Sequence, residues 1–102
     1  MTKNVIYRCS VLGLTLLLAW PAMAYTGDKL AKYAKLDLAR ARGIALAAHP
    51  GKIVDEELER EAGGSGLRYS FDIKRGSITQ EVGVDARTGV VLENDREGKN
   101  PD

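Results

Sequence analysis

The sequence predicts an α+β domain in which one N-terminal helix packs on a four-stranded antiparallel meander sheet. The pattern of apolar residues supports this prediction. An alanine-rich stretch with helical periodicity ends at Pro50 and Gly51, and beyond it apolar residues alternate with polar ones in segments separated by glycine-containing turns. Each predicted strand has one apolar face, and the helix carries the remaining apolar stripe. Packing the helix on the sheet buries both.

The predicted helix has small or apolar residues every three or four positions, which places them on one face. They are Leu30, Ala34, Leu38, Ala41, Ala45 and Ala48. Two starting points are open, Asp28 and Asp37, and the second can accept hydrogen bonds from the unpaired N–H groups of a first turn. The helix stops at His49, because Pro50 drives the preceding residue out of the α region and Gly51 permits the turn.

Four strands are predicted after this stop, over residues 52–60, 67–74, 78–85 and 90–92. The second alternates most clearly, with Leu67, Tyr69, Phe71 and Ile73 on one face. A glycine-rich loop at residues 61–66 separates the first strand from the second.

The ends of this strand region are less regular. In the first strand, strict alternation would place Val54 on the same face as Leu58, and Ile53 on the opposite face. Residues 93–102 are polar and without periodicity, and we expect them to form a disordered tail.

The N-terminus has the pattern of a secretory signal. Lys3 and Arg8 precede an apolar run at residues 11–20, and residues 22–24 form a small-x-small cleavage site. We expect cleavage near Ala24 and a periplasmic or secreted mature protein without an integral membrane segment. The alternative is a retained anchor, but the apolar run is shorter than the roughly 20 residues that cross a bilayer.

Charge and cysteine content exclude several classes of function. Loss of Lys3 and Arg8 lowers the basic side chains from 15 to 13, against 14 acidic ones, and a near-neutral surface does not suit nucleic acid. Cys9 is the only cysteine and would leave with the signal peptide. The mature chain would then have no thiol for a disulfide, a metal site or a nucleophile.

Two stretches resemble the PepSY family. Residues 45–54 are similar to its alanine-rich helix, Pro-Gly stop and strand, and residues 84–91 are similar to its VDAxTG-V hairpin. In this hairpin Asp85 and Thr88 can accept hydrogen bonds from loop N–H groups, and Gly89 takes the positive φ. The resemblance covers residues 36–95. Residues 1–24 are then the signal peptide, residues 25–35 a lead-in, and residues 96–102 a polar tail.

The resemblance implies a cystatin-like fold, known from propeptides of secreted metallopeptidases and from free exported domains. It also implies a role in modulating or inhibiting peptidases, or in binding proteins at the cell envelope. It brings no catalytic residues, so Pro50, Gly51, Asp85, Thr88 and Gly89 count as a structural motif. We therefore expect a non-enzyme that binds another envelope or secreted protein. The alternative is a small envelope sensor or an accessory protein that binds a ligand or metal ion.

The remaining chemistry also favours structural roles. His49 is the only histidine, and an imidazolium at a helix C-terminus interacts favourably with the helix dipole. Ser65, Ser70 and Ser77 have no histidine near them in the sequence. Carboxylates at residues 55–61 suit an edge strand that resists pairing better than they suit a calcium loop. We expect no catalytic residue, no metal site and no cofactor.

The fourth strand is a candidate partner-binding edge. Val90, Val91 and Leu92 are consecutive apolar residues, and Glu93 is the nearest charge. A weakly charged edge can accept an extended peptide as an additional strand. The alternative is that the polar tail folds over this edge and covers it.

Overall fold

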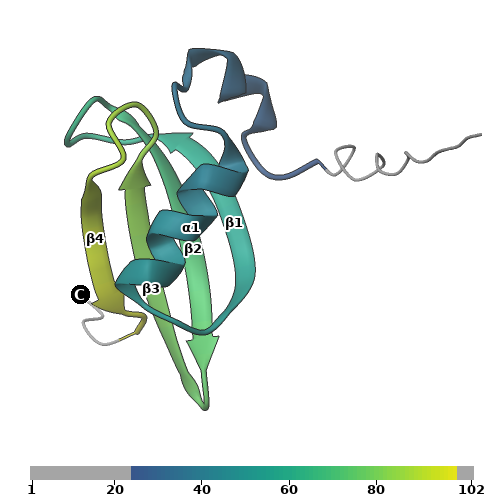
Figure 1. The fold of residues 1–102 in the computed structure, drawn as a ribbon, viewed down its shortest axis with the longest axis vertical. Coiled ribbons are helices and arrows are strands. Elements are labelled where there is room, and N and C mark those ends of the chain that lie inside the picture. The colour runs from purple at the N-terminus through teal and green to yellow at the C-terminus, as the bar shows by residue number, and fades with distance from the viewer. Residues whose placement is uncertain (1–23, 99–102) are drawn as a thin grey trace, which may run out of the picture.

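The computed structural model describes residues 24–98 as a two-layer α+β domain (Figure 1). A 3₁₀ helix, η2 (Asp28–Tyr33), precedes the α-helix α1 (Leu38–Ala48). Four strands follow: β1 (Lys52–Arg60), β2 (Leu67–Arg75), β3 (Ile78–Asp85) and β4 (Val91–Arg96). They pair antiparallel in the order β1-β2-β3-β4, which confirms the predicted fold class.

The two candidate starts of the helix belong to different elements. Asp37 caps α1, because its Oδ1 accepts a hydrogen bond from the Arg40 N–H at 2.8 Å. The lead-in from Asp28 forms η2 instead of extending α1. Between the two helices the N–H groups of Lys35 and Leu36 both donate to the carbonyl of Ala86, at 2.9 and 3.0 Å. This attachment to the loop after β3 separates η2 from α1.

The core lies between α1 and one face of the sheet. Ala41 and Ala45 are fully buried, and their small side chains let the helix approach β2 and β3 closely. The sheet contributes the larger buried side chains, which are Leu58, Leu67, Tyr69, Phe71, Ile73, Val82 and Val84. Tyr69 also donates a hydrogen bond from its hydroxyl to the Leu36 carbonyl at 2.8 Å, so its polar end is satisfied.

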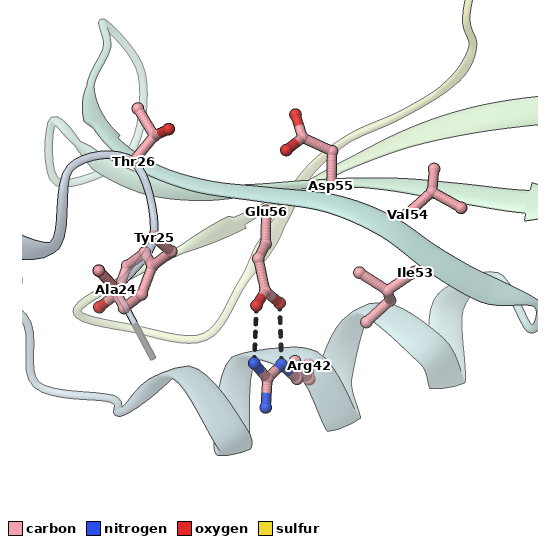
Figure 2. A pocket seen from close by; sticks show the side chains of 8 residues that line it. All are labelled: Ala24, Tyr25, Thr26, Arg42, Ile53, Val54, Asp55 and Glu56. Carbon is pink, nitrogen blue, oxygen red and sulfur yellow. Dashed lines mark hydrogen bonds and ion pairs between the residues drawn. The ribbon is translucent and has the colours of Figure 1, made fainter. Parts of the chain in front are cut away.

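A bulge in β1 overturns the strict alternation expected there. The pairing with β2 shifts between Ile53 and Asp55, so Val54 is an additional residue on β1. Ile53 therefore lies on the α1 side together with Glu56 and Leu58, and Val54 is half exposed on the other side (Figure 2). The expectation that Val54 shares a face with Leu58 was wrong, because one inserted residue reverses the faces on either side of it.

The fourth strand is longer than expected. The predicted disordered tail began at Glu93, but β4 continues through Arg96 and pairs with β3 as far as Gln80. Hydrogen bonds to β3 hold this polar segment in a strand despite its weak strand propensity. Val90 lies just before β4, in the loop.

The predicted signal peptide lies outside the described residues, except for Ala24. In the part of the chain that is described, no helix combines the length and the apolar character needed to span a membrane.

Candidate functional site

The Asp85 carboxylate is the centre of the predicted hairpin motif. It accepts hydrogen bonds from the N–H and hydroxyl of Ser65 at 2.6 and 2.8 Å, and from the N–H groups of Arg87 and Thr88 at 2.8 and 3.1 Å. The residue is only 1% exposed. Burial opposes its ionisation, but the hydrogen bonds from Ser65 and Arg87 outweigh burial and lower the pKa of Asp85 to about 2.

The other motif residues hold turns in place. Gly89 has a φ of 82°, and a Cβ there would lie 3.3 Å from Ile44 and 3.4 Å from Leu36. Thr88 accepts a hydrogen bond through its Oγ1 from the Val90 N–H at 3.2 Å. Gly51 follows Pro50 where a Cβ would meet the Lys74 carbonyl and the Ile73 side chain, each at 2.7 Å.

These five residues do not form one site. Gly51 lies against the C-terminal part of β2, and the Asp85 hairpin lies beside the first residue of β2, Leu67, whose carbonyl accepts from the Ala86 N–H. The motif therefore stabilises both ends of the sheet.

Within residues 24–98 no hydrogen bond joins His49 to a serine side chain. His49 caps the end of α1 through its backbone N–H, which donates to the Ala45 carbonyl at 2.9 Å. The hydroxyls of Ser65 and Ser70 donate to the carboxylates of Asp85 and Glu59. Within residues 24–98, no group of three or more His, Cys, Asp or Glu side chains could hold a metal ion.

A groove of about 540 Å³ lies between the N-terminal segment, α1 and β1 (Figure 2). The guanidinium of Arg42 crosses it and donates to both carboxylate oxygens of Glu56, at 2.8 and 2.7 Å. The groove residues are Ala24, Tyr25, Thr26, Arg42, Ile53, Val54, Asp55 and Glu56. The two charged groups that face each other in the groove are thus already paired, in a partly exposed ion pair at the rim of the core.

The two edges of the sheet differ in how they are covered. On β1 the Leu58 N–H donates to the Thr26 carbonyl at 2.9 Å, and Thr26 forms a parallel bridge with Glu57. Gly27 makes this approach possible, because a Cβ there would overlap the Leu58 carbonyl. On β4 no strand of the described chain pairs with the outer edge. The predicted edge residues Val90 and Val91 are 54% and 37% exposed, and Leu92 is half-buried.

The backbone of β4 presents hydrogen-bonding groups outward. The Glu97 N–H donates to the Thr79 carbonyl at 2.8 Å. This hydrogen bond lies next to Gln80 and Arg96, which are opposite each other in the register of β3 and β4. In an antiparallel ladder, two opposite residues flanked by such a bond form no backbone hydrogen bonds with each other. The N–H and C=O of Arg96 therefore point away from β3, as do those of Asn94 two residues earlier.

The same reasoning applies to Val91. The Asp85 N–H donates to the Val90 carbonyl at 2.8 Å. This hydrogen bond lies next to Val84 and Val91, which are opposite each other in the register. The backbone groups of Val91 therefore also face outward. The sequence identified the apolar start of this edge, but the outward groups at Asn94 and Arg96 follow only from the register of β4.

Residues 35–95 match the family model described as the peptidase propeptide and YPEB domain, PepSY. The chain belongs to the PepSY family. The match confirms the resemblance inferred from the sequence. It includes α1 and all of the sheet except Arg96, and it leaves Tyr25, Thr26 and η2 outside the PepSY domain. The chain matches no curated protein and no solved structure.

Proposed function

We propose that this PepSY domain is an exported, non-catalytic module that binds another envelope or secreted protein, and in this way modulates or inhibits a peptidase. The family match supports a peptidase-propeptide-like role in general. The placement of His49 at a helix end and of the serines against carboxylates supports binding over catalysis.

The observation that carries the proposal is the outer edge of β4, with which no strand of residues 24–98 pairs. Val91, Asn94 and Arg96 present backbone N–H and C=O groups to a strand that could be added there, and Val90 and Val91 offer exposed apolar surface beside them. The opposite edge, on β1, is partly occupied by Thr26. The domain therefore has one edge suited to an extended segment of a partner protein.

Binding at the β4 edge can be tested with a pair of proline variants. The protein purified from the producing cells would capture partners from an envelope extract. The affinity of each captured protein, once purified, would then be measured by calorimetry. Val91→Pro removes an outward N–H from β4 and should weaken binding at least tenfold, because a proline cannot donate to an added strand. Val54→Pro places the same residue on the β1 edge, at the bulge, and should retain the parent affinity.

The outcome depends on both variants being folded, which circular dichroism and a thermal melt would establish. A folded Val91→Pro protein that binds a captured partner as tightly as the parent does would overturn the proposed edge. If the captured partner is a peptidase, its activity with and without the domain would test modulation directly.

A further inference from the structure

The face of the sheet opposite α1 carries a concentration of carboxylates. α1 covers one face, and within the described chain no second layer covers the other (Figure 1). Because side chains alternate along strands, this open face receives Asp72 from β2, Glu81 from β3, and Glu93 and Asp95 from β4. The register pairs Glu81 with Asp72 on one side and with Asp95 on the other.

The same register places three basic residues on the open face, Lys52 and Lys74 opposite each other and Arg68 further along β2. The guanidinium of Arg68 lies 3.3 Å from Glu61 and 3.5 Å from Glu93, and its side chain is only 9% exposed. Asp72, Glu81 and Asp95 have no ion-pair partner among residues 24–98. Burial, together with the charges of Glu93 and Asp72, raises the pKa of Glu81 to about 7. Glu93 is therefore paired with Arg68, whereas Asp72, Glu81 and Asp95 lack an ion-pair partner in the described chain.

The backbone geometry places two of these carboxylates where an added strand would come closest. Asn94 and Arg96 would make the hydrogen bonds to an antiparallel partner strand, so Glu93 and Asp95 would occupy the positions between those bonds. Directly opposite side chains at such positions have Cβ atoms about 4.5–5.5 Å apart. A lysine or arginine of the partner would therefore reach these carboxylates without bending the strand.

From the open edge and its charge together, we infer that the partner segment bound at β4 is an extended peptide with basic side chains at alternate positions, lying beside Glu93 and Asp95. The inference rests on the proposed function and deepens it by assigning the chemistry of the partner. We assign the cation to side chains of the partner, since the carboxylates of residues 24–98 form no group of three that could hold a metal ion.

A synthetic peptide in which lysine and threonine alternate is a suitable probe. The protein purified from the producing cells should bind it, while a peptide of the same composition with all lysines in one block should bind at least fivefold more weakly. Replacing the carboxylates in the double variant Glu93→Gln with Asp95→Asn should weaken binding of the alternating peptide about fivefold, as two cross-strand charge pairs would. High salt should have a similar effect.

The matched control is Asp55→Asn with Glu57→Gln, which removes the same charge from β1. This double variant should bind the alternating peptide within twofold of the parent. If both double variants lost the same affinity for the alternating peptide, the inference would be overturned, because the peptide would then be attracted by the net charge of the protein alone. Failure of the parent to prefer the alternating peptide would also overturn it.

Comparison with Val91→Pro separates the inference from the proposed function. If the captured partner loses affinity in Val91→Pro but not in the Glu93 and Asp95 double variant, the edge is correct and the basic chemistry is wrong. If Val91→Pro, shown to be folded, has no effect on either the partner or the peptide, the edge itself is not the binding site.

Discussion

Asp85 and Ser65 join two loops that are distant in the sequence. The Asp85 carboxylate accepts hydrogen bonds from both the N–H and the hydroxyl of Ser65, at 2.6 and 2.8 Å. Ser65 lies in the loop between β1 and β2, and Asp85 ends β3. Gly64 permits this contact, because a Cβ on it would overlap an Asp85 oxygen. One buried carboxylate therefore fixes the glycine-rich loop against the family's signature hairpin.

Asp85→Asn should destabilise the domain by about 2 kcal/mol, since hydrogen bonds to a charged group are lost and an amide N–H₂ would face backbone donors. A urea unfolding titration would measure the change. Asp95→Asn, on an exposed position of β4, is the control and should not lower stability. Equal stability of Asp85→Asn and the parent would show that the carboxylate does not hold the two loops together.

Acid should remove the contribution of Asp85. Because the folded pKa of Asp85 is lowered from 3.8 to about 2, its carboxylate stabilises the fold above about pH 4, and this stabilisation disappears as the pH falls toward 2. The free energy of unfolding of Asp85→Asn should therefore depend less on pH in that range than that of the parent.

Near neutral pH, Glu81 on the open face should make the free energy of unfolding increase as the pH falls, which is opposite to the effect of Asp85 in acid. The folded pKa of Glu81 is raised from 4.5 to about 7, so between these values the folded protein binds more protons than the unfolded chain. The free energy of unfolding should increase as the pH is lowered from about 8 to 5. Glu81→Gln should flatten this dependence. A parent whose stability is constant or rises with pH over the same interval would contradict the prediction.

Gly89→Val should destabilise the domain by roughly 1–3 kcal/mol, because a β-branched residue resists the φ of 82° found there. Gly43→Ala is a useful comparison, since a Cβ at this exposed helical position meets nothing within 4 Å. It should stabilise α1 by about 0.5–1 kcal/mol. Thermal melts of both variants would test the expected loss of stability in Gly89→Val and the expected gain in Gly43→Ala. A melting temperature of Gly89→Val equal to the parent's would show that the positive φ at Gly89 does not matter for stability.

The mature protein is predicted to begin at Tyr25, because residues 22–24 form a small-x-small site behind an apolar run. Intact-mass measurement of the protein from the cell envelope would test this. A mass that includes residues 1–24 would instead indicate a retained anchor, and would also remove the basis for the expected loss of Cys9.

Much of the fold could be predicted because its signals are local. The change from helical to alternating periodicity at Pro50 and Gly51, and the turn residues Asp85 and Gly89, depend on backbone preferences within a few residues. The strand at residues 67–74 predicted which face of the sheet is buried. The helix stripe was right for Ala41 and Ala45 but wrong for Ala48, which is exposed at the last position of α1, and its members Leu30 and Ala34 lie outside α1. The same local signals indicated the PepSY family, and the match over residues 35–95 bore this out.

Tertiary structure decided the features that depend on pairing between distant segments. The bulge at Val54 and the continuation of β4 through Arg96 depend on hydrogen bonds to neighbouring strands, which local propensity does not encode. The split between η2 and α1 depends on the attachment of Lys35 and Leu36 to Ala86.

The candidate binding edge combines both kinds of information. By itself the sequence determined that the chain has an apolar segment at residues 90–92 and an excess of carboxylates toward its C-terminus. Only the register of β4 against β3 decided that Asn94 and Arg96 turn their backbone groups outward while Glu93 and Asp95 face the open side. Strand register is set by contacts along the whole sheet, and a shift of one residue would reverse every one of these assignments.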